Sequence, residues 1–548
     1  MNKRFLFFVL LLTGPAAFAQ KNSTAAAPAK PKLVVGLVID QMRWDYLYRY
    51  QARYGTGGFK RLIGQGFSYE NTFIPYVPTY TAVGHTTVYT GGVPATHGIV
   101  GNNWYEKSLR KNMYCTEDSS VEAVGIAPNE RAGKMSPRNC WATTVCDELR
   151  LSNNFQSKVI GVALKDRGGI LPAGQSANAA YWFDEKTGKW ITSTFYMKQL
   201  PGWVNDYNSR DRAGELMKTD WNTLYPISSY TLSTADEKEY ESTIPGEKTT
   251  TFPHKVSAIT NNKYLAVKYT PYGTTLSFEF AKEAIVNEKL GTGSVTDFLA
   301  LSISSTDYIG HEFGPNSIEA EDTYLRLDKD IADFLAYLDN KVGKGNYMMF
   351  LTADHGAAHI PGFLKEHNIP AGTFSDEGFR TELNKAISDS FGFNNAIMNL
   401  QNYQLYLNTD SMETRGVDVK AVKKFVMKKL RAKPFITSVF ETADGNTTVL
   451  PEPIRTMVIN GYNASRSGDI QFLVRPGYFD GYNKGTTHGL WNPYDSHIPL
   501  LFYGWGVKHG KSNRTVYMTD IAPTVAAKLQ IQMPNASVGK VLEEITNN

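Results

Sequence analysis

Five short runs of apolar residues recur along the chain, each followed by polar residues or by a turn. They begin at Lys32, Ser157, Asp297, Asn346 and Ile498 and read KLVVGLVID, SKVIGVALKDR, DFLALSISSTD, NYMMFLTADHG and IPLLFYGWG. Continuous apolar runs of this length, separated by helical patterns, are typical of strands buried on both faces of a largely parallel sheet. Such sheets bind ligands at the carboxyl ends of their strands. We therefore predict an α/β fold with a largely parallel central sheet and helices on both faces.

A core helix is indicated between two of these runs, where apolar residues repeat at helical spacing with charged residues between them. The apolar positions are Leu327, Ile331, Phe334, Leu335 and Leu338. A stripe of this kind faces the interior of a globular protein. We assign this helix no role in chemistry.

Two stretches of the chain depart from the strand and helix pattern. Residues 183–281 are rich in Gly, Pro, Thr, Tyr and Trp and show weak periodicity, which predicts an insertion beside the ligand-binding face. Residues 370–477 combine a basic helix over residues 419–433 with strand-like pieces, which predicts a small α+β lobe. We predict one domain over residues 33–548 that carries both insertions.

The N-terminus has the features of a secretory signal. Lys3 and Arg4 precede an apolar run over residues 5–12, and small residues form a cleavage site before Gln20. We predict a signal peptide over residues 1–19, a flexible lead-in over residues 20–32, and a periplasmic or secreted mature protein. No later stretch reaches the roughly 18 apolar residues of a membrane-spanning helix. No cysteine follows the cleavage site to carry a lipid, so we predict no membrane anchor.

Charge and cysteine content exclude several classes of protein. The net charge is +4 over 548 residues, without a basic stripe that interleaves with aromatic residues, so we expect no nucleic-acid binding. The three cysteines, Cys115, Cys140 and Cys146, permit at most one disulfide and argue against a zinc–thiolate site. Cys140 and Cys146 are expected in one helix, where a separation of six positions gives poor bridging geometry.

Carboxylates and imidazoles gather where the predicted strands end. Following the strands in order, they are Asp40, Asp307, His311, Asp354 and His355, with His488 just before the last strand. These six side chains supply the nitrogen and oxygen donors for two zinc-like ions at one edge of the sheet, although manganese or iron could use the same donors. A lone aspartate at a strand end is commonly a helix cap. Capping would have to be invoked independently at four places, so we predict a two-metal site.

Six motifs with a fixed order carry a family resemblance. They read PTYTAVGHTTVYTG, THGIVGNN, DYIGHEFGP, TADHG, THG and DIAPTVAAKL. From Lys32 to about Leu529 the chain resembles the alkaline phosphatase superfamily. Within it, the chain looks most like the nucleotide pyrophosphatase/phosphodiesterase branch and the secreted bacterial phosphate-irrepressible alkaline phosphatases. The resemblance implies an alkaline phosphatase-like fold and a hydrolase of phosphate esters that uses two Zn²⁺ ions.

The resemblance also implies roles for individual residues. Thr81, four residues before His85, is expected to be the nucleophile, with Thr79 as the competing choice. One zinc would be held by Asp307, His311 and His488, and the other by Asp40, Asp354, His355 and the oxygen of Thr81. A metal ion can stabilise the alkoxide of a threonine, and a second ion about 4 Å away can hold the leaving oxygen.

Three further residues are expected to bind the phosphoryl group. Asn102, five residues after His97, matches the asparagine that hydrogen-bonds a phosphoryl oxygen in the family, although an asparagine in a turn is often structural. Lys165 and Arg167 follow the second strand, and in an extended chain both would face the site. A monoester carries close to two negative charges and a diester one, so two cations favour a monoester over the alternative of a solvated turn.

We therefore predict an exported, monomeric alkaline phosphatase (EC 3.1.3.1) that releases phosphate from small phosphate monoesters through a phosphothreonine intermediate. One alternative is a phosphodiesterase or nucleotide pyrophosphatase with the same metals, distinguished only by Lys165 and Arg167. Another is a non-catalytic phosphate-binding relative. A sulfatase is disfavoured because Ala82 and Val83 follow Thr81 in place of the Pro-x-Arg that follows a sulfatase nucleophile. A phosphomutase would be expected in the cytoplasm.

The remaining histidines are predicted to be structural partners or surface residues and not metal ligands. Those expected near the motifs as structural partners are His85, His97, His359, His367 and His497. Those expected on the surface are His254 and His509.

Overall fold

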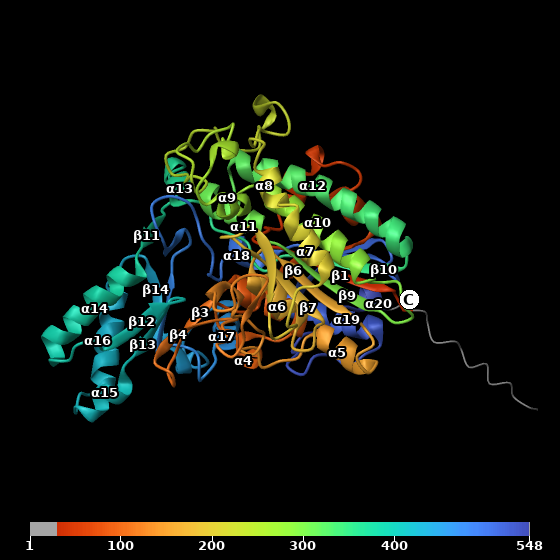
Figure 1. The fold of residues 1–548 in the computed structure, drawn as a ribbon. Coiled ribbons are helices and arrows are strands. Elements are labelled where there is room, and N and C mark those ends of the chain that lie inside the picture. The colour runs from red at the N-terminus through yellow and green to blue at the C-terminus, as the bar shows by residue number, and fades with distance from the viewer. Residues whose placement is uncertain (1–29, 547–548) are drawn as a thin grey trace, which may run out of the picture. The chain divides into compact units, whose positions relative to one another are not determined.

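A large mixed sheet forms the centre of the protein in the computed structural model, which describes residues 30–546 (Figure 1). The predicted signal peptide and most of the predicted lead-in lie outside the described residues. The strands of the sheet are β1 (Leu33–Ile39), β2 (Phe67–Phe73), β5 (Ala123–Val124), β6 (Val159–Ala163), β7 (Ala179–Asp184), β8 (Lys189–Ser193), β9 (Asp297–Ile303), β10 (Tyr347–Thr352), β17 (His497–Ile498), β18 (Leu500–Gly504) and β19 (Gly510–Tyr517). Their order is β17, β2, β18, β10, β1, β9, β6, β7, β8 and β5, with β19 paired to β2.

The middle of this sheet is parallel, and the outer pairs are antiparallel except for β19, which runs parallel to β2. Strands β10, β1, β9, β6 and β7 run in one direction, and every residue of β1, β9 and β10 is buried. β18 runs antiparallel to β10, so its amino end meets the carboxyl ends of β1, β9 and β10. All five apolar runs are strands, as predicted. The last run, β18, departs from the parallel direction, and His488 reaches the ligand-binding edge because it precedes this antiparallel strand.

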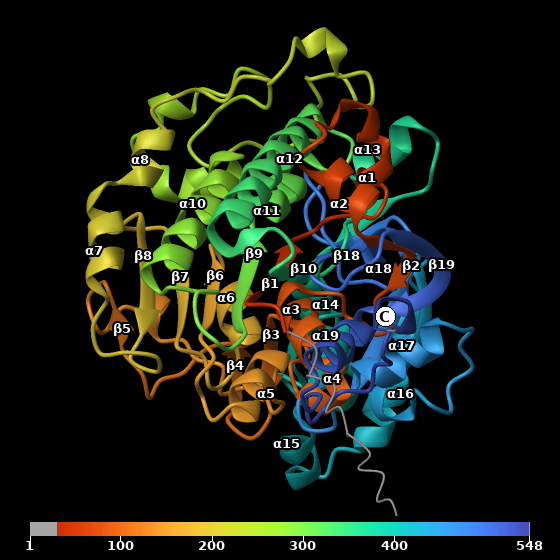
Figure 2. The ribbon, with the colours of Figure 1, turned by 90° about the vertical axis from the view of Figure 1, so that its right-hand side faces the viewer.

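Helices cover both faces of the sheet, as predicted (Figure 2). One layer contains α3 (Thr81–Thr90), α5 (Val145–Ser152), α6 (Asp166–Ala173) and α19 (Ile521–Leu529). The other layer contains α2 (Phe59–Gln65), α10 (Tyr272–Asn287), α11 (Ser305–Phe313) and α12 (Ile318–Leu338). The predicted core helix corresponds to α12, and its apolar stripe, including Leu327, Ile331 and Phe334, is fully buried.

A smaller sheet with its own apolar core lies beside the large one, in the teal part of the chain in Figure 1. Its strands and helices are β12 (Ile397–Gln401), β13 (Gln404–Leu407), β14 (Ile436–Glu441), β15 (Ile470–Val474), α14 (Asp376–Phe391), α15 (Thr409–Thr414) and α16 (Val419–Arg431). Helix α16 carries the basic sequence and buries Val422, Val426 and Leu430 against this core. The limits that we assign to the two insertions stay a prediction.

The remaining elements are short. The helices are α1 (Tyr46–Arg49), α4 (Pro94–His97), α7 (Gly202–Ser209), α8 (Arg212–Leu216), α9 (Lys263–Ala266), α13 (Pro361–Glu366), α17 (Ile454–Gly461), α18 (Pro493–Ser496) and α20 (Glu543–Thr546). The strand pairs are β3 (Asn103–Glu106) with β4 (Lys111–Tyr114), and β11 (Gly372–Phe374) with β16 (Tyr478–Asp480). Within residues 30–546, no helix has the length and apolarity needed to cross a membrane. All three cysteines are buried and free, and Cys140 precedes α5 instead of sharing a helix with Cys146, contrary to expectation.

Candidate active site

Thr81 is the first residue of helix α3 and lies against the carboxyl end of β10. The preceding residue, Tyr80, is extended, so the chain enters the helix directly at the edge of the sheet. Thr81 is buried, and its Oγ1 lies 3.3 Å from His355 Nε2. Gly84, one turn later, permits this close approach, because a Cβ there would lie 2.6 Å from Asp354 Cβ. The helix therefore presents the Thr81 hydroxyl to a histidine at the strand end.

The other threonines of this segment have their hydroxyls engaged elsewhere. Thr79 Oγ1 donates to the Leu490 carbonyl at 3.0 Å and accepts from Gly489 N–H at 3.1 Å. Thr86 and Thr90 donate to the carbonyls one turn earlier in the helix. The geometry thus favours Thr81 over Thr79 as the reactive hydroxyl.

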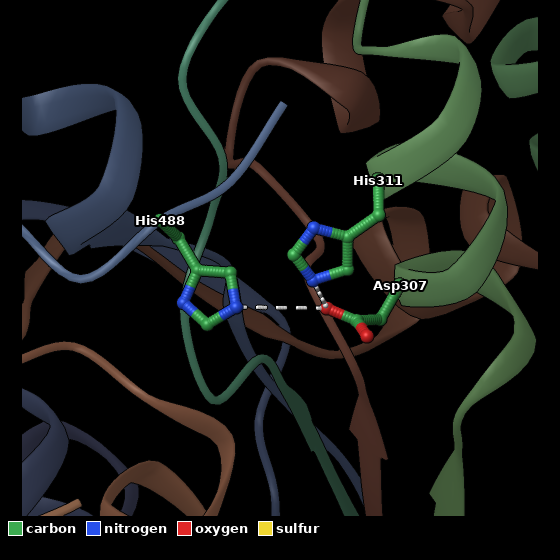
Figure 3. Close-up of side chains that lie close together, drawn as sticks. All are labelled: Asp307, His311 and His488. Atoms are coloured by element: carbon green, nitrogen blue, oxygen red, sulfur yellow. Dashed lines mark ion pairs between the residues drawn. The ribbon is translucent and has the colours of Figure 1, made fainter. Parts of the chain in front are cut away.

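A first cluster of donors consists of Asp307, His311 and His488 (Figure 3). Asp307 and His311 lie one turn apart on α11, and His488 comes from the loop before β17. Asp307 Oδ1 is 3.2 Å from His311 Nε2 and 3.8 Å from His488 Nε2. The Nδ1 atom of His311 lies 2.7 Å from the Thr486 carbonyl, and that of His488 lies 2.6 Å from the Thr79 carbonyl. A carbonyl only accepts, so both Nε2 atoms present a lone pair to the cluster.

A second cluster lies deeper and includes the Thr81 hydroxyl. His355 Nε2 is 3.5 Å from Asp40 Oδ1 and 3.4 Å from Asp354 Oδ2, and all three residues are fully buried. His355 Nδ1 donates to the Gly356 carbonyl at 2.9 Å, which again leaves the lone pair of Nε2 free to bind a metal ion. Asp40 Oδ1 and Asp354 Oδ2 are buried with no hydrogen-bond partner in the described chain. Buried carboxylate oxygens that accept no hydrogen bond are suited to bind a cation.

The spacing of both clusters fits metal ions of the zinc type. Ligands at about 2.0–2.1 Å from a tetrahedral ion are separated from one another by about 3.3 Å, close to the distances found in each cluster. Asp307 also lies near Asp40 and His355, so the clusters are adjacent. Burial, together with the charges of Asp307 and Asp354, raises the pKa of Asp40 well above its usual value. Burial and the neighbouring imidazoles of His355 and His311 hold the pKa of His488 well below its usual value, which keeps it neutral as a ligand must be.

Lys165 lies between the two clusters. Its Nζ is 2.7 Å from Asp40 Oδ2 and also bonds to Asp307 Oδ2, so it contacts one carboxylate of each cluster. Burial opposes its charge, but Asp307 and Asp40 outweigh burial and raise the pKa of the ammonium. Lys165 immediately precedes α6, and Arg167 lies inside that helix. Lys165 itself is extended, but the expectation of an extended chain through both residues is wrong, because α6 begins at Asp166 and contains Arg167.

Arg167 reaches the site from α6 and is held by Tyr114. Its Nη1 donates to Tyr114 Oη at 3.0 Å, and Tyr114 Oη donates to Asp166 Oδ1 at 2.7 Å. Arg167 forms no salt bridge with a described carboxylate, and its Nε is buried without a partner. A cavity of about 460 Å³ is lined by both Lys165 and Arg167 and also by Tyr114, Lys268 and Tyr308. Lys165 and Arg167 therefore line the same cavity, although they do not lie on one extended segment.

Asn102 is fixed by helix α3, which begins at Thr81. Its Oδ1 accepts from the Ala82 N–H at 2.9 Å, one residue after Thr81. Because this oxygen is the acceptor, the amide NH₂ group remains available as a donor next to Thr81. Asn103, in contrast, is exposed at the start of β3. The structure thus brings the Asn102 side chain, but not that of Asn103, to helix α3.

The other histidines are engaged in contacts away from the clusters or on their border. His85 bonds to the Thr81 carbonyl and to Ser302, and His97 bonds to Thr87 and to the Ile99 N–H. His509 is exposed, as predicted. The expectation of a surface position is wrong for His254, which is fully buried between Glu247 and Glu319. Two residues at the site, Gln41 and Tyr114, have no recognisable signal in the sequence, because only the tertiary fold brings them to the clusters.

Comparison with known proteins places these residues in a family. The sequence model of the family described as type I phosphodiesterase / nucleotide pyrophosphatase matches residues 34–497. The alkaline phosphatase PafA of Elizabethkingia meningoseptica is 51% identical over 99% of both chains. The alkaline phosphatase PhoV of Synechococcus elongatus is 52% identical over 97% of both chains. A protein of Myroides odoratus that is named a calcium-transporting ATPase is 54% identical over 94% of both chains.

The fold agrees with this placement. The crystal structure of wild-type PafA superposes with a TM-score of 0.93 and 51% identity, and the match covers 95% of this chain and 100% of that one. The agreement extends over the large sheet, both helical layers and the smaller lobe. The chain belongs to the type I phosphodiesterase/nucleotide pyrophosphatase family, and its fold is that of the alkaline phosphatase PafA.

Proposed function

We propose that this protein is an exported two-zinc phosphomonoesterase that releases inorganic phosphate from organic phosphate monoesters through a phosphothreonine intermediate. One observation carries the proposal. Thr81 Oγ1, His355 Nε2 and the unpartnered oxygens Asp40 Oδ1 and Asp354 Oδ2 converge within about one metal-ligand spacing of each other. Two relatives that cover nearly the whole chain are named alkaline phosphatases, which supports the activity. The N-terminal sequence supports export.

The two clusters divide the donors between two ions. Asp307, His311 and His488 would hold one ion, and Asp40, Asp354 and His355 would hold the other together with the Thr81 oxygen. When bound, the ions would stabilise the Thr81 alkoxide and the negative charge on the leaving oxygen. Calcium, suggested by the name of the Myroides odoratus relative, prefers sites made of oxygen ligands, whereas each cluster here contains imidazole nitrogen.

The residues of the chain then account for each bond that changes. Thr81 Oγ attacks phosphorus, so a Thr81 O–P bond forms while the bond from phosphorus to the leaving oxygen breaks. Water attacks the phosphothreonine in the second step, which breaks the Thr81 O–P bond, releases phosphate and restores the hydroxyl. The amide NH₂ of Asn102 would donate to a nonbridging oxygen in both steps, where negative charge is concentrated.

Lys165 and Arg167 favour a monoester over a diester. An ammonium has three N–H donors, of which Asp40 and Asp307 take two, so one remains for a phosphoryl oxygen. The guanidinium of Arg167 has five donors and forms one side-chain bond, to Tyr114, which leaves an edge for two oxygens of a dianion. Both cations would stabilise the second negative charge of a phosphate monoester, which a diester lacks.

The test compares kcat/KM for p-nitrophenyl phosphate with kcat/KM for methyl p-nitrophenyl phosphate on zinc-reconstituted protein. We expect the wild type to prefer the monoester. The Lys165→Ala, Arg167→Ala double variant should lose roughly 100-fold or more on the monoester and much less on the diester, because hydrogen bonds to charged groups contribute about 1.5–3 kcal/mol each. Thr81→Ala should remove both activities.

Two controls make the result decisive. Lys268→Ala removes a cation of the same cavity that bonds to Glu185 and not to either cluster, so it should leave the substrate preference unchanged. Zinc content must be measured in every variant, because Lys165 contacts two of the candidate ligands. A wild type that prefers the diester would make the protein a phosphodiesterase with the same metal site and refute the monoester assignment.

A further inference from the structure

Gln41 has a backbone conformation that side-chain-bearing residues rarely adopt. It follows Asp40 directly, its φ is 64°, and its side chain is almost completely buried. A left-handed conformation at a residue other than glycine is unfavourable, and it persists where the surroundings impose it, often at functional sites. The question is what holds Gln41 in place and which groups benefit.

Gln41 contacts both clusters with two different donors. Its backbone N–H donates to Asp354 Oδ1 at 3.1 Å, and its side-chain Nε2 donates to Asp307 Oδ1 at 2.8 Å. Asp354 belongs to the cluster that contains Thr81, whereas Asp307 Oδ1 is the oxygen that faces His311. The left-handed turn after Asp40 is what aims these two donors at carboxylates on different elements. One residue therefore connects the end of β10 to helix α11.

Gly310 provides the space for the amide of Gln41. It lies on α11 between Asp307 and His311, and a Cβ at this position would lie 1.9 Å from Gln41 Oε1. A glycine inside a helix is unfavourable relative to alanine, so its presence needs a reason. The close approach of the Gln41 amide supplies that reason.

We propose that Gln41 is a positioning residue for both metal clusters: its backbone N–H orients Asp354, its amide orients Asp307, and Gly310 makes room for the amide. The inference rests on the two-metal site of the proposed function. Hydrogen bonds to ligating carboxylates fix the direction of the ligand and tune the ion, and their loss typically lowers metal affinity about 10–100-fold.

The first experiment measures zinc affinity of the full chain by competition with a chromophoric chelator, after the protein has been stripped of metal. Gln41→Leu keeps the backbone N–H and removes the amide. We expect two zinc ions per chain, with one dissociation constant raised about 10–100-fold and the other nearly unchanged. Unchanged constants would overturn the inference. Equal weakening of both sites would also overturn it, because the amide contacts only Asp307.

A double-mutant cycle tests the same contact if Gln41→Leu folds poorly. Gly310→Ala is made in the wild type and in the Gln41→Gly background, where the backbone N–H remains and the amide is absent. We expect Gly310→Ala to weaken one zinc site and to lower the melting temperature only when the Gln41 side chain is present. In the Gln41→Gly background it should be neutral or stabilising, because alanine favours a helix. Equal effects in both backgrounds would refute the contact.

The zinc titration also separates this inference from the proposed function. A wild-type chain that binds no zinc would overturn both. A wild type that binds two zinc ions and hydrolyses monoesters, with Gln41→Leu indistinguishable from it in zinc affinity, would overturn only the role of Gln41.

Discussion

Two buried groups of histidine and carboxylate in this protein differ in how their imidazoles are bonded. His355 at the site gives its Nδ1 proton to the Gly356 carbonyl and turns Nε2 toward Asp40 and Asp354. His254, under helix α12, has Glu247 at 2.8 Å from Nδ1 and Glu319 at 3.2 Å from Nε2. Both histidines are completely buried.

The difference teaches what distinguishes a metal site from a structural ion pair. Around His355 the carboxylate oxygens Asp40 Oδ1 and Asp354 Oδ2 accept no well-aligned hydrogen bond, although His85 Nδ1 lies 3.2 Å from Asp354 Oδ2, and the His355 imidazole has a free lone pair. Around His254 both ring nitrogens face carboxylates that can accept a hydrogen bond. Burial opposes protonation, but the hydrogen bonds that His254 donates to Glu247 and Glu319, together with their charges, outweigh burial and raise the pKa of His254 to about 9. Both places contain one imidazole and two carboxylates, but only the group around His355 has atoms with lone pairs that are free to bind an ion.

The largest effect should come from removing an imidazole at each place. His355→Ala should reduce bound zinc from two ions per chain to one and lower phosphatase kcat/KM by about a thousandfold or more, because the Thr81 alkoxide loses its stabilising ion. His254→Gln should leave two zinc ions and nearly normal kcat/KM. Metal analysis and steady-state kinetics on both variants check this. Loss of zinc in His254→Gln alone would reverse our assignment of the two groups.

A smaller effect concerns stability as a function of pH. The folded pKa of His254 is about 9 and its usual value is 6.5, so the proton stabilises the folded chain fully below pH 6.5. This stabilisation declines between pH 6.5 and 9 and is absent above that range. A shift of this size corresponds to at most about 3–4 kcal/mol. Burial raises the pKa of Glu319, although the hydrogen bond and charge of His254 lower it. The cost of ionising the buried Glu319 offsets part of the stability that the His254 proton contributes.

Urea unfolding of zinc-loaded protein at pH 6.5 and pH 9.5 measures the contribution of His254. The wild type should lose stability between the two values, and His254→Gln should lose clearly less. His509→Gln is the matched control, because His509 is exposed and forms no described ion pair. Identical pH dependence of the wild type and His254→Gln would show that the His254 imidazole is neutral, and not an imidazolium, in the folded chain.

The smallest effect concerns the hydrogen bonds among Tyr114, Asp166 and Arg167, which border the site and contain no imidazole. Tyr114→Phe removes the bond that holds Arg167 Nη1, while Asp166 keeps its bond from Thr116. We expect kcat/KM for p-nitrophenyl phosphate to fall about three- to tenfold, which corresponds to about one hydrogen bond. The rate with the diester and the zinc content should not change. An equal loss on both substrates would show that Tyr114 supports the fold and not Arg167.

The sequence predicts the strands and the positions of the candidate ligands because both are local features. Apolar runs of fixed length predict β1, β9 and β10, and the polar residues that follow them must lie where those strands end. Family motifs add Thr81 and Asn102. The same local logic fails at Arg167, where a helix starts directly after the strand, and at His254, whose loop is covered by α12.

By itself, then, the sequence determined an α/β chain with a largely parallel central sheet and with aspartates and histidines near its strand ends, because periodicity and strand boundaries follow from neighbouring residues. Only the tertiary structure decided which imidazole nitrogens are free, which carboxylate oxygens lack a partner, and that Gln41 contacts Asp307 and Asp354 together. These contacts join residues more than 250 positions apart. Their geometry depends on the direction of β18 and on the packing of α3 and α11 at one edge of the sheet, which no local pattern records.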